Sequence, residues 1–303
     1  MTRSLRGFAL AVAALLTTTS LSAQLIAHGA DGTTVRDMVT QLRNYREQRR
    51  AAGVNKVKPN IVSVDWTKEA FIIPAAGSLA GSNGTFFKSD VTIANRRAVP
   101  QVISIGYLAR GVNNGSNPVQ KFTIPANTTT IDNDFIGTVL GKSGLGTLLV
   151  IAVTSTAAGA PIDDNAEIDG FSRIWTPQPI QPGASSSIGT VSQAFESIDI
   201  EDSLATSYGY GLKQDANFRT NVGMVNLYEV ANTFTINIVG SGGNTSFNQT
   251  VQPYSMEQPS VPAGNWGDFY VRITSAASNF NWWSAYGTSV DNRTGDGWVS
   301  HVH

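Results

Sequence analysis

The sequence contains no cysteine, only three histidines and little charge, and each shortage excludes a class of chemistry. Without cysteine there are no disulfides, thiolate nucleophiles, cysteine-ligated zinc sites or cysteine-linked lipid anchors. The histidines are His28, His301 and His303, in the first few mature residues and in the last turn, where a preorganised imidazole is not expected. The net charge is −1, so there is no electrostatic reason to expect binding to nucleic acid or to an anionic membrane.

Long apolar runs are also scarce, and the one near the start is short. Gly7 to Leu16 is too short to span a bilayer, follows Arg3 and Arg6, and precedes the small residues of Leu21-Ser-Ala23. This order is typical of a secretory signal peptide, which we expect at residues 1–23. The alternative is a buried N-terminal helix. We therefore expect a secreted protein, periplasmic, cell-surface or extracellular, with no transmembrane segment.

One amphipathic helix is expected within residues 24–58. Thr33 or Thr34 can cap it, and Gly53 and Pro59 end it. The helix has an apolar stripe along one face, and its opposite face is rich in arginine. We expect the apolar stripe to pack on the first β domain with the basic face in solvent, and the alternative is a docking helix for assembly or for a surface. The stripe has helical spacing and consists of Val35, Met38, Val39, Leu42 and Tyr45.

The sequence does contain an internal repeat. Phe87–Asn95 returns 131 residues later as Phe218–Asn226, and the apolar positions that follow keep this offset. A repeat of this length predicts a duplicated domain. At the same offset, Ile103, Ile105 and Tyr107 map onto Phe234, Ile236 and Ile238. Further expected pairs are Ala70–Phe71 with Ala194–Phe195, Gly146–Val150 with Gly267–Val271, and Phe171–Trp175 with Tyr286–Val290.

Both copies have the pattern of β-strands. Residues 102–108 and 233–239 alternate between apolar and polar side chains, whereas residues 148–153 and 269–273 are more apolar and suit central strands. Glycine and asparagine clusters between such runs predict turns. We therefore expect an all-β protein of two tandem antiparallel β-sandwich (immunoglobulin-like) domains preceded by one short N-terminal helix. The expected domains are residues 59–180 and 181–303.

No catalytic, cofactor-binding or metal-binding residue is predicted. The acidic clusters lie in turn-like stretches, where Asp is an ordinary residue. Two alternatives stay open: a carboxylate pair of a polysaccharide-active enzyme, and a calcium site. The candidate calcium ligands are Asp163, Asp164 and Asp169, or Asp199, Glu201 and Asp202, and a further acidic cluster lies at Asp132-Asn-Asp134.

The six tryptophans are candidates for packing or for contact with sugars. We expect most of them to pack in cores and at edges. Trp282 and Trp283 are adjacent, so in a strand one ring points inward and the other outward or into an interface. If exposed, these two and Trp266 are the ligand-contact candidates.

A resemblance supports the same fold. At Phe87–Asn95, Phe218–Asn226 and Val290–Asp296 the chain resembles exported, largely uncharacterised bacterial proteins with paired immunoglobulin-like β-sandwich repeats, over roughly residues 70–300. The resemblance implies fold and export and supplies no catalytic residues.

The expected function is that of a secreted, non-catalytic structural or binding protein of the cell envelope or extracellular space. Its expected partner is a cell-surface protein or a glycan, and oligomers are expected through the helix or the sheet edges. The alternative is a polysaccharide-binding module or a carboxylate-dependent polysaccharide-active enzyme.

Overall fold

The computed structural model describes residues 24–52, 69–81, 84–178, 189–200, 206–277 and 282–302, and in these ranges the chain is mostly antiparallel β-structure. The expected all-β class is therefore confirmed. The predicted signal peptide, the predicted end of the helix at Gly53 and Pro59, and the residues Trp66, Glu201, Asp202 and His303 lie outside the described residues.

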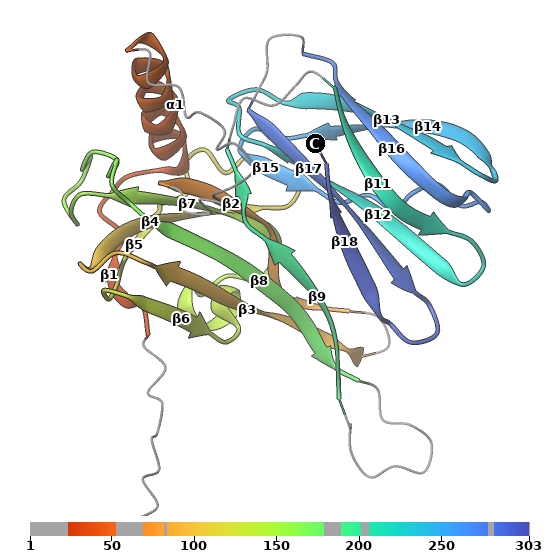
Figure 1. Cartoon of the computed structure of the whole chain (residues 1–303), viewed down its shortest axis with the longest axis horizontal. Helices are drawn as coiled ribbons and strands as arrows, with labels where there is room; N and C mark the ends of the chain where they lie inside the picture. Colours follow the sequence, from red (N-terminus) through yellow and green to blue (C-terminus); the bar gives the residue numbers. More distant parts are fainter. Residues whose placement is uncertain are drawn as a thin grey trace, which may run out of the picture.

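The first sheet group contains two sheets that are joined through one strand (Figure 1). One sheet has the order β1 (Ile26–Gly29), β5 (Gln120–Ile124), β4 (Gln101–Ala109), β7 (Gly144–Val153) and β2 (Ala70–Ala80), with β10 (Ile198–Asp199) added to β2. The other has the order β6 (Thr128–Asp132), β3 (Phe86–Asn95), β8 (Ile168–Pro177) and β9 (Thr190–Glu196). The far end of β2 pairs with β3, and a π-helix covers Phe135–Val139.

The second sheet group repeats this arrangement with two separate sheets. One has the order β11 (Thr206–Gln214), β16 (Gly267–Ser275), β13 (Asn232–Gly240) and β14 (Gly243–Val251). The other has the order β15 (Ser255–Glu257), β12 (Phe218–Asn226), β17 (Trp283–Asp291) and β18 (Gly297–His301). Strand for strand, these orders match β2-β7-β4-β5 and β6-β3-β8-β9 of the first group.

Equivalent residues of the two groups occupy equivalent environments. Ile103 in β4 and Phe234 in β13 are both completely buried, each in the core of its own group. Phe171 stands opposite Thr92, and Tyr286 stands opposite Gly223, which confirms the pairing of these segments. The predicted match of Gly146 with Gly267 is wrong by two residues, because Ala152 faces Ile103 where Ser275 faces Phe234. A shift of two residues keeps each side chain on the same face of the sheet.

The clearest shared detail is one buried asparagine in each group. Asn95 and Asn226 end β3 and β12, and each side-chain oxygen accepts a hydrogen bond from the backbone two residues later. Each side-chain amide is within 3.4 Å of three carbonyl oxygens: those of Val99, Ile124 and Pro125 for Asn95, and those of Val230, Val251 and Gln252 for Asn226. The repeated asparagine is therefore a structural residue that ties a turn to the next strand connection.

The predicted start of the second copy differs from the structure. Ala194–Phe195 was matched with Ala70–Phe71, but Ala194 and Phe195 lie in β9, which pairs with β8 of the first group. The strand that corresponds to β2 is β11, because β11 pairs with β16 as β2 pairs with β7. The chain thus adds β9 and β10 to the first group before it enters the second, and the expected boundary at residue 181 precedes both strands. The predicted match rested on two residues, Ala194 and Phe195, and a pattern this short does not distinguish β9 from the strand that corresponds to β2.

Three apolar cores separate the four sheets. One core lies inside each group, and the third lies between the groups. That third core joins the outer face of β4-β7-β2 to the outer face of β15-β12-β17. It contains Leu149 and Ile151 from the first group and Met256 and Tyr286 from the second. The sheet β6-β3-β8-β9 and the sheet β11-β16-β13-β14 therefore form the two outermost layers.

The helix α1 (Val35–Ala51) is part of the core between the groups. Thr34 caps it through a reciprocal capping box with Asp37. Val35, Met38, Val39 and Leu42 are at most 2% exposed, and Tyr45 packs against the same core. The docking alternative is therefore wrong for this stripe, because both sheet groups already bury it.

The basic face of α1 was predicted to be solvated, but its arginines form ion pairs with both sheet groups. Arg46 forms ion pairs with Glu69 at 3.4 Å and with Asp199 at 3.0 Å, both in the first group. Arg43 pairs with Glu229 of the second group at 3.1 Å and lies over the rings of Tyr228 and Trp282. The helix thus links the two groups through charge as well as through apolar contact.

The connection between β4 and β5 makes further contacts to the second group. Asn114 is fully buried, and its side-chain amide donates to the carbonyl oxygen of Tyr254 at 2.9 Å. Ser255 donates its hydroxyl back to the carbonyl oxygen of Ala109, and Arg110 pairs with Glu257. The asparagine-rich connection between β4 and β5 therefore contributes a buried residue, Asn114, to the interface.

Candidate functional site

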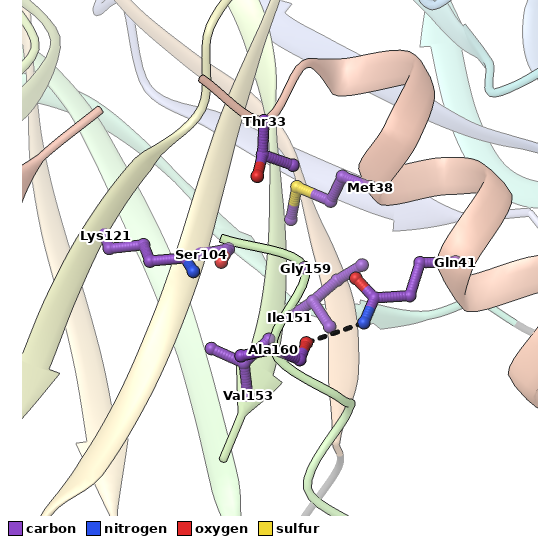
Figure 2. A pocket seen from close by; sticks show the side chains of 9 residues that line it. All are labelled: Thr33, Met38, Gln41, Ser104, Lys121, Ile151, Val153, Gly159 and Ala160. Carbon is purple, nitrogen blue, oxygen red and sulfur yellow. Dashed lines mark hydrogen bonds between the residues drawn. The ribbon is translucent and has the colours of Figure 1, made fainter. Parts of the chain in front are cut away.

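The space beneath the N-terminal end of α1 is a small cavity of about 10 Å³ (Figure 2). Met38 and Gln41 reach it from the helix, and Lys121 and Ser104 from the sheet. Gln41 donates its amide to the carbonyl oxygen of Ala160 at 2.7 Å. A volume of this size admits about one water molecule, so the cavity is not a ligand site.

The buried amine beside this cavity is fully used by the fold. Lys121 is 3% exposed, and its ammonium pairs with Asp31 at 2.6 Å and donates to the carbonyl oxygens of Thr156 and Ala157. Burial alone raises the pKa of Asp31, but hydrogen bonds from Lys121 and Thr33 outweigh it and lower the pKa from 3.8 to about 2. This pair anchors the segment before α1 and leaves no free amine for chemistry.

The tryptophans named as ligand contacts do not form a shared surface. Trp283 is 3% exposed in the core of the second group, whereas Trp282 packs against the core between the groups under Arg43. The expectation that these neighbours point opposite ways is confirmed. Trp266 packs against the core of the second group and donates its ring N–H to the carbonyl oxygen of Pro262. None of the three is placed on the flat row of rings that sugar binding requires.

The acidic clusters are drawn into ion pairs and turns. Asp163 pairs with Arg97 at 2.6 Å, Asp164 with Arg49 at 3.2 Å, and Asp199 with Arg46. Among the described residues, no group of three or more His, Asp or Glu side chains is arranged to hold a metal ion. Burial raises the pKa of Asp132, at the end of β6.

An aromatic cluster that the tryptophan count did not indicate lies on an outermost sheet. Tyr208 and Tyr210 in β11 are 36% and 58% exposed, and their ring centroids are 6.3 Å apart with ring planes 12° from parallel. Tyr270 in β16 lies 6.4 Å from the first ring and 6.0 Å from the second. Three phenol rings therefore form one exposed group, which we call the tyrosine cluster.

A β-bulge explains why these rings lie side by side. The pairing of β11 with β16 shifts between Gly209 and Leu212, so that Tyr210 and Gly211 together stand opposite Tyr270. Gly211 has a φ of +69°, which favours glycine at this bulge. The bulge brings Tyr210 beside Tyr270 and keeps Tyr208 and Tyr210 on one face.

Most of the rest of this sheet face is polar, and its charges are Arg272 and, two residues before Tyr270, the exposed Asp268, which pairs with Lys213 at 3.8 Å. Register places its side chains in two rows across four strands, with Arg272 the one charged residue in the rows. Hydroxyl and amide groups pair along the strands, for example Thr235 with Asn248 at 2.9 Å. The first row is Thr206, Thr274, Thr235 and Asn248, and the second is Tyr208, Arg272, Asn237 and Ser246. The tyrosine cluster and these rows define the tyrosine face.

The sequence carries a signal for this face that does not involve tryptophan. Tyr208-Gly-Tyr210 has aromatic residues two positions apart, so both rings project from the same side of a strand. Glycine between them leaves the opposite side without a bulky residue. The contribution of Tyr270 could not be read from the sequence, because the bulge that aligns it depends on strand register.

Two comparisons of the sequence with known proteins found no match. No protein-family model matches the chain, and the search of curated proteins returned no significant match. Among the described residues, no helix combines the length and apolar character needed to cross a membrane.

Proposed function

We propose that this chain is a secreted, non-catalytic binding protein that holds a neutral polysaccharide on the tyrosine face. The observation that carries the proposal is the exposed group of Tyr208, Tyr210 and Tyr270. Phenol rings offer apolar area for the C–H faces of sugar rings and a hydroxyl for hydrogen bonding. The proposed export rests on the signal-like sequence at residues 1–23.

The surroundings of the cluster favour a neutral ligand over a charged one. The rows beside it contain threonine, asparagine and serine, which can both donate to and accept from sugar hydroxyls. The charges on this face are few and of both signs, Arg272 in the rows and the Lys213–Asp268 pair beside Tyr270, so the face gives little net field to attract an anion or a cation. The face is also the outer surface of a four-stranded sheet, which offers side chains from four strands in one open area and so suits an extended chain rather than a small enclosed ligand.

The proposal is tested by measuring the affinity of the protein for soluble neutral glucans, xylans and mannans, by affinity electrophoresis and titration calorimetry. Tyr210→Ala is expected to weaken the interaction of the best ligand at least ten-fold, and Tyr270→Ala to do the same. Phe86→Ala is the matched control, because Phe86 is an aromatic residue 46% exposed on β3, away from this face, and should leave binding unchanged.

Two results would contradict the proposal. One is that no neutral polysaccharide binds the intact mature chain, or that binding ignores both tyrosine substitutions. The other is release of reducing ends from any polysaccharide that stops after substitution of a single Asp or Glu, because this would make the chain an enzyme.

A further inference from the structure

The other outermost sheet carries a groove of about 480 Å³ that neither the tyrosine face nor the core uses. This volume lies within the range of about 300–1,000 Å³ typical of small-ligand sites. β3, β6, β8 and β9 contribute to it, along with the residues that follow β3 and β9. The groove is therefore built on a sheet, which positions side chains more precisely than a free loop does.

An exposed ring flanked by two carboxylates occupies the groove. Phe171 in β8 is 40% exposed, and Glu196 in β9 is its direct cross-strand partner. Direct partners on one face have Cβ atoms about 4.5–5.5 Å apart. Asp169 lies two residues before Phe171 and so projects from the same face. The ring of Phe171 therefore has one carboxylate neighbour along its own strand and one on the adjacent strand.

The two carboxylates differ in what else they do. One oxygen of Asp169 accepts hydrogen bonds from the backbone N–H of Gly170, at 2.8 Å, and from the hydroxyl of Ser197, which fix its position. Glu196, in contrast, has no hydrogen bond or ion pair through its side chain to any residue that the structure describes. Its charge is left for a ligand.

One cation and three hydroxyls complete the lining. Arg96 follows β3, and within the described part of the chain its guanidinium has no side-chain partner either. Two carboxylates against one guanidinium leave a local charge of −1, which favours a cationic ligand. The hydroxyl groups belong to Thr92, Thr129 and Ser197.

We propose that this groove binds an amino sugar oligomer through a primary ammonium group held over Phe171 between Asp169 and Glu196. The ammonium gains both carboxylates and the face of the ring, an arrangement suited to cations. The hydroxyls of the oligomer supply acceptors for Arg96 and partners for the threonine and serine hydroxyls. The ligand differs from that of the tyrosine face in charge, and the proposal does not depend on the tyrosine face binding anything.

Titration calorimetry with the glucosamine trisaccharide and its N-acetylated counterpart on the mature chain tests this proposal. Acetylation removes the positive charge and keeps the sugar backbone, so the free amine form is expected to bind at least ten-fold more tightly. Glu196→Gln and Phe171→Ala should each weaken the free amine form about ten-fold. Asp268→Asn is the matched control, because Asp268 is a highly exposed carboxylate on the β11–β16 edge, and binding should not change.

Further arms separate the possible outcomes. Equal binding of the two trisaccharides, or binding unaffected by Glu196→Gln and Phe171→Ala, overturns the proposal. 1,4-Diaminobutane binding as tightly as the free amine trisaccharide also overturns it, because the groove would then read an amine and no sugar. Tyr210→Ala should keep full affinity for the free amine form, which distinguishes failure at this groove from failure of the proposed function. Unchanged thermal unfolding of each variant shows that the surface substitutions leave the fold intact.

Discussion

The two sheet groups share one strand order but use their outer faces in opposite ways. In the first group, the outer face of β4-β7-β2 is buried under α1 and the second group, and the face of β3-β8-β9 is open. In the second group, β12-β17 is buried and the equivalent of the first buried face, β11-β16-β13, is open. The two groups therefore share a strand framework and differ in which outer face carries the apolar side chains of the core between them.

Single positions show the reversal most plainly. Phe171 and Tyr286 occupy the same register position in β8 and β17. Phe171 is 40% exposed in the groove, whereas Tyr286 is completely buried and stands edge-on to Phe195 at a ring distance of 5.4 Å. The same place in the framework thus carries a candidate ligand contact in one group and an interface residue in the other.

The largest expected effect comes from a charge on the outward side of the central strand. Ile151 in β7 is completely buried between the groups, and its equivalent in β16 is Thr274, on the tyrosine face. Ile151→Asp buries an unpaired carboxylate and should lower the free energy of unfolding by about 5 kcal/mol. Thr274→Asp should change it by less than about 1 kcal/mol. Urea denaturation of both variants measures the difference, and equal losses would show that the two faces are not used in opposite ways.

The second effect concerns what the groups share. Asn95→Ala and Asn226→Ala each remove a buried side chain that bonds to three carbonyl oxygens and one backbone N–H. Each should cost about 3 kcal/mol, because buried polar groups lose their partners. The two costs should agree within about 1 kcal/mol in denaturant unfolding. A cost confined to one of the two would break the equivalence of the repeats.

The third effect is steric and belongs to the second group alone. A Cβ atom at Gly223 would overlap the ring of Tyr286, which is completely buried. Gly223→Ala should therefore cost about 2–3 kcal/mol in the free energy of unfolding. The equivalent position in the first group is Thr92, which already carries a side chain beside the exposed Phe171, so Thr92→Ala should cost less than about 1 kcal/mol. Thermal unfolding that ranks the two in reverse order would contradict this account.

The smallest effect depends on pH and on the anchor of α1 in the first group. The pKa of Asp31 is lowered from 3.8 to about 2 in the folded protein. The ionised carboxylate therefore stabilises the fold fully above about pH 4, and this contribution, about 2 kcal/mol, is lost as the pH falls towards about 2. Asp31→Asn should flatten the fall in stability over that window, whereas Asp268→Asn should leave its slope unchanged.

Much of the framework could be predicted from the sequence, because it depends on local pattern. Alternation placed Ile103 and Phe234 in their cores, and helical spacing with Thr34 placed α1 correctly. The two asparagines were visible as identities, although their role in bonding two turns was not. These features need only strand periodicity, capping and the repeat itself.

The rest depends on contacts between segments far apart in the chain. Asn114 looks like an ordinary turn residue, and only the approach of Tyr254 buries it. β9 looked like the start of a new copy because a short apolar pair carries little register information. The tyrosine cluster and the groove likewise depend on cross-strand register, which no single segment specifies.

The core between the groups has a consequence for how two ligands would be held. Because α1, Ile151 and Tyr286 pack into one apolar layer, the tyrosine face and the groove are not carried on separately tumbling modules. Two polymers, one bound at each site, would be held at a constant distance from each other, without the entropic cost of ordering a flexible linker. Such a protein would crosslink neutral and cationic polysaccharides in a mixed matrix.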